Sequence, residues 1–83
     1  MEKTLVCIHV PSIGLVTDAF IPEGINVASL VSLLIETVEQ ASRGFYKSSG
    51  NEVVCIERLG ITLNPTVSLQ KYKLENGDRL VLI

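Results

Sequence analysis

The side chains of this 83-residue chain that are best suited to chemistry are two cysteines and one histidine, at positions 7, 55 and 9. Thiolates and imidazoles bind zinc, but zinc sites need three or four such ligands, which usually come in close pairs such as Cys-x-x-Cys. Cys7 and Cys55 lie far apart in the sequence, and His9 adds only one more ligand. We therefore expect no metal site, no redox pair and two free thiols.

Ser48-Ser49-Gly50 has the composition of a phosphate-binding loop. A true phosphate loop opens a helix and continues into Lys-Ser or Lys-Thr, and this stretch does neither. We expect a solvated loop. No pair of carboxylates and no Ser/His/Asp arrangement is evident, so the chain is predicted to have no catalytic residues, to bind no cofactor and not to be an enzyme.

The length of the chain predicts one small domain spanning residues 1–83. Such a domain has a single core and no room for an enclosed active site. Seven basic and nine acidic residues give a net charge of −2, without the basic stripe that binds phosphates, which argues against a nucleic-acid partner. No segment approaches the ~18 consecutive apolar residues of a membrane span. We expect a cytoplasmic protein without membrane insertion.

Hydrophobic periodicity predicts the elements that position these residues. Strands are expected at 3–10 and 15–21, joined by a turn and followed by Pro22, which suits the edge of a sheet. A helix is expected at 27–43, with Asn26 as N-cap, Arg43 in the last turn and Gly44 at the left-handed C′ position. Further strands are expected at 53–59, 61–64 and 79–83, and 45–52 is a polar loop.

This order of elements is that of an α+β domain of the β-grasp type, with one helix packed across one face of a mixed sheet. The stretch LGITLNPTVSLQKYKL at 59–74, followed by NGDRLVLI, resembles the second half of ubiquitin. The matching pattern is Leu69-x-x-Tyr72-x-Leu74. The resemblance implies the strand order 2-1-5-3-4, with the first and last strands central and parallel.

Ubiquitin and the sulfur carriers act through a tail that ends in Gly-Gly, and this sequence ends at Ile83. We therefore expect no conjugation chemistry. Gly77, Asp78, Leu80 and Leu82 resemble the end of the YukD-like (EsaB-like) bacterial ubiquitin-like proteins of type VII secretion loci. That resemblance implies an accessory or regulatory protein that contacts the secretion machinery. The alternatives are a carrier or modifier whose tail is missing, and a detached ubiquitin-like domain of a secretion membrane protein.

Residue parity divides each strand between two faces of the sheet. We expect the residues facing the helix to form the core, with Leu69 and Leu74 closing its open end. The sheet residues of the core are Val6, Ile8, Val10, Leu15, Ile21, Val54, Ile56, Leu80 and Leu82, and the helix residues are Val27, Leu30, Val31, Leu34 and Val38.

The other face of the sheet is predicted to be apolar and to bind a protein partner or a second copy of the chain. Its expected residues are Leu5, Cys7, His9, Val16, Asp18, Phe20, Val53, Cys55, Glu57, Val81 and Ile83. Cys7, Val81 and Cys55 should form a stripe, with the two cysteine Cα atoms ~10 Å apart and too distant for a disulfide. The alternative is a register slip that buries both cysteines against the helix.

Phe45 and Tyr46 follow the predicted helix. One interpretation is that one ring folds back over the core while the other lies on the surface. The other is that the two rings together dock a partner.

Overall fold

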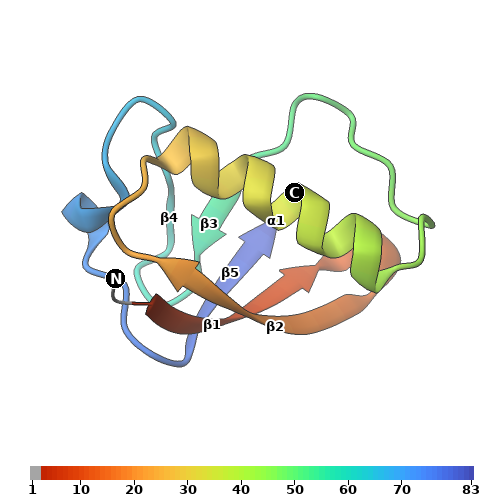
Figure 1. Cartoon of the computed structure of the whole chain (residues 1–83), viewed down its shortest axis with the longest axis horizontal. Coiled ribbons are helices and arrows are strands. Elements are labelled where there is room, and N and C mark those ends of the chain that lie inside the picture. Colours follow the sequence, from red (N-terminus) through yellow and green to blue (C-terminus); the bar gives the residue numbers. More distant parts are fainter. Residues whose placement is uncertain (1–2) are drawn as a thin grey trace.

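The computed structural model describes residues 3–83 as one five-stranded sheet crossed by one helix (Figure 1). The elements are β1 (Lys3–Val10), the 3₁₀ helix η1 (Pro11–Ile13), β2 (Leu15–Pro22), α1 (Val27–Ala41), β3 (Val54–Ile56), β4 (Ile61–Thr62), the 3₁₀ helix η2 (Leu69–Tyr72) and β5 (Asp78–Leu82). The strand order is β2-β1-β5-β3-β4, and β1 and β5 are parallel. This confirms the predicted β-grasp arrangement and the edge position of β2.

Helix α1 begins at the predicted residue but ends two residues early. The Asn26 side chain accepts a hydrogen bond from the Ser29 N–H at 2.8 Å, so Asn26 is the N-cap. At the other end, the N–H groups of Arg43 and Gly44 donate to the carbonyls of Gln40 and Glu39, which is the Schellman pattern. Arg43, with φ 56°, therefore occupies the C′ position that we had assigned to Gly44, and it lies outside the helix.

The core lies between α1 and the facing side of the sheet and contains fourteen buried apolar residues. Twelve of them were predicted from parity and helical spacing. Leu15 and Val31, also predicted, are only half-buried and pack against this core. Leu63 is buried although it follows the short β4, and Leu69 closes the end of the core as expected, beside a half-buried Leu74.

The strands after the helix are shorter than predicted. β3 covers three residues rather than 53–59, because the Gly60 N–H donates to the carbonyls of Ile56 and Glu57 and closes a turn. β4 covers only Ile61–Thr62, and β5 begins at Asp78. Val53 and Ile83 lie outside the assigned strands but exchange two backbone hydrogen bonds of 3.0 Å, which extends the β3–β5 ladder.

A buried carboxylate joins the start of β5 to the turn before β4. Asp78 accepts hydrogen bonds from Arg58 Nε at 2.7 Å and Nη2 at 3.0 Å, and from the Glu75 N–H at 2.9 Å. The hydrogen-bonded Arg58 guanidinium outweighs the effect of burial and holds the pKa of Asp78 below its ordinary value. Asp78 therefore anchors the connection between η2 and β5.

Candidate protein-binding surface

The outer face of the sheet, opposite α1, has an uncharged row of side chains that crosses all five strands. Register places His9 beside Val16 of β2 and Val81 of β5, and places Cys55 of β3 between Val81 and Thr62 of β4. His9, Val81 and Cys55 are half-buried by their neighbours, whereas Val16 at the edge is 55 % exposed. This row is the centre of the face.

The predicted stripe of Cys7, Val81 and Cys55 is wrong, because β1 and β5 are shifted by two residues along each other relative to the prediction. The β1 residue opposite Val81 is His9, and Cys7 lies opposite Arg79 instead. Parity assigns a face to each residue but does not set how far two parallel strands are shifted along each other. The alternative slip, which would bury both cysteines against the helix, is also wrong, because Cys7 and Cys55 are half-buried on the outer face and are free thiols.

A charged row runs beside the uncharged one; its Asp18 and Glu57 were expected on this face, but its Arg79 was missed from the sequence. Asp18 pairs with Cys7 in the β1–β2 ladder, and Cys7 pairs with Arg79. The Arg79 Nε atom lies 3.4 Å from the Glu57 carboxylate. Arg79 has the same parity as Val81, so the outer face is mixed rather than uniformly apolar.

The charged row divides the apolar residues into two groups. On one side, the ladder pairs Leu5 with Phe20, which is 64 % exposed. On the other side, the uncharged row continues into Val53 and Ile83, the latter 66 % exposed. We call this larger group the outer patch. It consists of His9, Val16, Val53, Cys55, Val81 and Ile83.

The rings after the helix do not form one docking knob. Tyr46 packs against the core, and its hydroxyl donates to Glu52 at 2.7 Å, while Phe45 is 75 % exposed. This confirms that one ring folds back and the other lies on the surface. Phe45 follows α1, which covers the opposite side of the sheet from the outer patch (Figure 1). A binding role for Phe45 stays a prediction.

The loop at 45–52 is ordered around the Glu52 carboxylate. Besides the Tyr46 hydroxyl, this carboxylate accepts hydrogen bonds from the Ser48 hydroxyl and from the N–H groups of Ser49 and Gly50, at 3.0 to 3.1 Å. Burial alone raises the pKa of Glu52, but these hydrogen bonds outweigh it and lower the pKa to about 2. Burial and the bond to Glu52 raise the pKa of Tyr46 to about 12. Ser48, Ser49 and Gly50, which have the composition of a phosphate-binding loop, therefore bind a carboxylate of the same chain.

Residues 3–83 contain no group of three His, Cys, Asp or Glu side chains placed to hold a metal ion. Cys55 contacts the Thr62 hydroxyl, with 3.5 Å between Sγ and Oγ1.

Within residues 3–83, no helix has both the length and the apolar character that a membrane crossing requires.

Solved structures show which fold this arrangement belongs to. The ubiquitin-like domain of EccD5 from Mycobacterium xenopi superposes with a TM-score of 0.80 and 19 % identity over 100 % of this chain and 94 % of that chain. The ubiquitin-like domain of the type VII secretion system protein EccD1 from Mycobacterium tuberculosis has a TM-score of 0.74 and 16 % identity, over 100 % and 99 % of the two chains. The chain has the ubiquitin-like fold.

Other solved structures have similar scores. The ubiquitin-like domain of the Arabidopsis thaliana protein At2g32350 has a TM-score of 0.74 and 18 % identity, over 100 % of this chain and 78 % of that chain. A chain of the ESX-5 inner membrane complex matches with a TM-score of 0.80 and 19 % identity, and this protein spans 21 % of its length. No protein-family model and no curated protein sequence matches this chain.

Proposed function

We propose that this ubiquitin-like domain is a protein-interaction module of a bacterial type VII secretion system, and that it acts in the cytoplasm as an accessory or regulatory component. The YukD-like resemblance of the residues around Asp78 supports this proposal. So do the ubiquitin-like domains of type VII secretion proteins among its structural neighbours. The observation that carries the proposal is the outer patch, where six uncharged side chains gather on the face that α1 leaves open.

The outer patch has the anatomy of a protein-binding surface. Its middle is formed by half-buried Val81 and Cys55, and its ends by the more exposed Val16 and Ile83. The row of Asp18, Arg79 and Glu57 borders it with charges of both signs. Interfaces typically combine an apolar centre with a polar rim that sets orientation. The proposed occupant is a cytoplasmic part of the secretion membrane complex, and a second copy of the chain is the alternative.

A secretion assay tests this function. The gene is deleted in the organism that encodes it, and the deletion is complemented with the wild-type chain or with a Val16→Glu, Ile83→Glu double variant. The matched control is Phe45→Glu, which places the same charge on an exposed apolar residue outside the patch. Protein levels are compared by immunoblot.

We expect the deletion and the patch variant to lose export of the small type VII substrates, while the Phe45 variant exports normally. Normal export from the deletion strain would overturn the secretion role. Normal export with the patch variant would overturn the assignment of the surface. A change from dimer to monomer in the patch variant, measured by light scattering, would replace the secretion partner with a second copy of the chain.

A further inference from the structure

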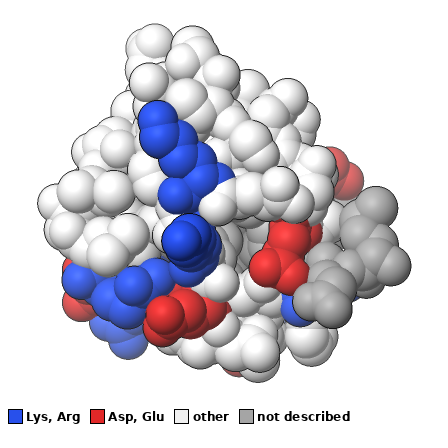
Figure 2. Space-filling model, turned by 90° about the vertical axis from the view of Figure 1, so that its left-hand side faces the viewer, with Lys and Arg blue, Asp and Glu red and all other residues white. Residues whose placement is uncertain are grey.

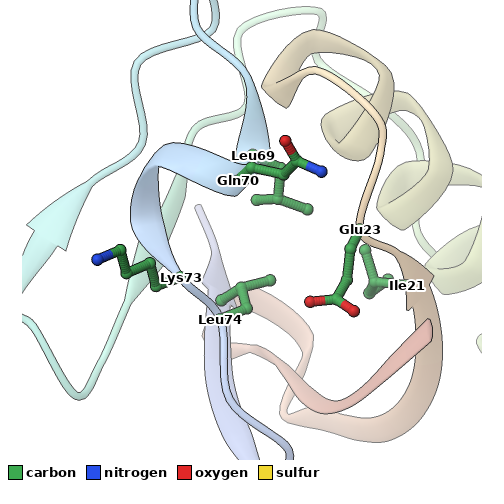
Figure 3. Close-up of a pocket in the computed structure, with 6 residues that line it drawn as sticks. All are labelled: Ile21, Glu23, Leu69, Gln70, Lys73 and Leu74. Atoms are coloured by element: carbon green, nitrogen blue, oxygen red, sulfur yellow. The ribbon is translucent and has the colours of Figure 1, made fainter. Parts of the chain in front are cut away.

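A pocket of about 230 Å³ opens at one end of the core, between the end of β2 and the 3₁₀ helix η2 (Figure 3). Its floor is apolar, because Ile21 and Leu69 belong to the buried core and Leu74 packs against it. Its remaining lining residues are Glu23, Gln70 and Lys73. Sites for small molecules usually have volumes of about 300–1,000 Å³. This pocket is therefore sized for a single long side chain rather than for a cofactor.

The walls of the pocket are held at a fixed separation. The Leu69 N–H donates to the Ile25 carbonyl and the Val27 N–H donates to the Val67 carbonyl, both at 3.0 Å. These bonds connect η2 and the segment before it to the chain between β2 and α1. On the far side of η2, the Tyr72 hydroxyl accepts a hydrogen bond of 2.9 Å from the Asn64 N–H. A ligand would enter a preformed site and would not have to order its walls.

The charged groups around the pocket are arranged unequally. The Glu23 carboxylate extends over the pocket toward Leu74, whereas the Lys73 side chain extends away from it (Figure 3). Lys73 has a left-handed backbone, with φ 50°, at the end of η2. Within residues 3–83 no hydrogen bond or ion pair engages the Glu23 carboxylate. Figure 2 shows this end of the molecule, where basic and acidic side chains lie side by side.

We propose that this pocket binds a lysine or arginine side chain of a partner protein. The aliphatic stem of such a side chain would lie on Ile21, Leu69 and Leu74, while its cationic head would reach the Glu23 carboxylate. Lysine and arginine bind in this way because their stems are apolar and their heads are charged. A purely apolar side chain would cover Glu23 without a partner for its charge, which is unfavourable, and an acidic one would be repelled.

This site is separate from the outer patch and does not depend on the proposed secretion role. The pocket lies at the end of the core beside η2, whereas the outer patch lies on the sheet face that α1 leaves open. A partner that used both would place a basic residue in the pocket and an apolar surface on the patch. Each contact can be removed without the other.

Three small probes test the pocket. The ¹⁵N-labelled full chain is titrated with n-pentylamine, n-pentanol and pentanoate at neutral pH, and amide chemical shifts are followed by NMR. The probes have five-carbon chains, and they differ in that their heads are cationic, neutral and anionic. We expect saturable shifts from pentylamine, centred on the amides of Gln70, Lys73 and Leu74, with millimolar affinity. Because the ion pair is solvent-accessible, we expect pentylamine to bind about threefold more tightly than pentanol, and pentanoate to bind most weakly.

Three variants, one of them a control, make the result decisive. Glu23→Gln should remove the preference of pentylamine over pentanol, whereas Glu36→Gln, at an exposed position of α1, should preserve it. Leu74→Ser should weaken all three probes, because it removes apolar surface from the pocket. Equal binding of pentylamine and pentanol to the wild-type chain, shifts centred outside the pocket, or a preference that survives Glu23→Gln would each overturn the proposal.

Discussion

The two faces of the sheet are built from the same strands and differ in what they contact. On the inner face Val6, Ile8 and Leu80 are fully covered by the rest of the core. On the outer face their direct neighbours Cys7, His9 and Val81 are half-buried beside the Arg79–Glu57 ion pair. Folding requires the side chains of the inner face to be apolar, because this face must exclude water. Folding places no such requirement on the outer face. An apolar group that persists there, as in the outer patch, is therefore the better indicator of a partner.

The largest expected difference between the faces is in core truncation. Ile8→Ala and Leu34→Ala should each lower the free energy of unfolding by about 2–5 kcal/mol, because each leaves a cavity among fully buried neighbours. Val16→Ala, on the exposed edge of the outer face, should lower it by less than about 0.5 kcal/mol. Chemical denaturation measures all three. Comparable losses at Ile8 and Val16 would mean that the two faces do not differ in the way described.

Two adjacent charged residues of β5 should differ in how much they contribute to the stability of the fold. Asp78 is buried and paired with Arg58, whereas Arg79 points outward and pairs with Glu57 at the surface. Asp78→Asn should cost about 1–3 kcal/mol, because it weakens charge-assisted hydrogen bonds to a buried group. Arg79→Gln should cost less than about 1 kcal/mol, as is usual for exposed ion pairs.

The pH dependence of the Asp78 variant has a defined sign. The pKa of Asp78 is lower in the folded chain, so its contribution to stability is complete above the ordinary aspartate pKa and is lost as pH falls through the folded value. The stability difference between the wild type and Asp78→Asn should therefore shrink under acid conditions. A difference that stays constant from neutral pH to pH 2 would contradict the role given to this carboxylate.

A smaller effect is expected in the loop after α1. Glu52→Gln should cost about 1 kcal/mol near neutral pH, because the carboxylate accepts four hydrogen bonds within its own loop. Since the pKa of Glu52 is lowered from 4.5 to about 2, this cost should diminish as pH falls through that interval. Urea denaturation at several pH values measures it. A cost that grows toward low pH would have the wrong sign.

Thiol labelling probes the outer face with little change in stability. Cys7 and Cys55 are free and half-buried, so a small alkylating reagent should modify both in the native monomer, more slowly than in the unfolded chain. Binding of a partner to the outer patch should protect Cys55 more than Cys7, because only Cys55 belongs to the patch. Native thiols as unreactive as those of a closed core would show that no accessible surface exists there.

Periodicity and parity were sufficient to predict the helix, the main strands and their buried faces, because the helix spacing from Val27 to Val38 and the alternation in β1 each have only one solution with a buried face. The strand order was predicted from the resemblance to ubiquitin. They were insufficient for relations between distant segments. The offset that places His9, rather than Cys7, beside Val81 depends on how two strands align in three dimensions. The same holds for the Arg58–Asp78 pair and for the pocket under Glu23, whose walls come from separate parts of the chain.

At the end of α1, in the loop that follows it and at Arg79, the structure differs in detail from what the sequence predicted. Glycine is the residue type that usually takes the left-handed C′ position, but the helix ends two residues sooner than predicted, so Arg43 takes that position and Gly44, which is also left-handed, follows it. The polar composition of 45–52 indicated a solvated loop. Only the structure shows that the Glu52 carboxylate accepts hydrogen bonds from other groups of this loop. Arg79 could have been assigned to the outer face by the parity that placed Val81 there.

Site-specific photo-crosslinking tests the central claim, that the outer patch binds the secretion machinery, most directly. A benzophenone amino acid is placed at Val16 on the outer patch or, as a control, at the exposed Glu36 of α1, in cells that assemble the type VII membrane complex. We predict that the chain labelled at Val16 crosslinks to a subunit of that complex and that the chain labelled at Glu36 does not. Equal crosslinking from both positions, or crosslinking from Val16 only to a second copy of the chain, would contradict the claim.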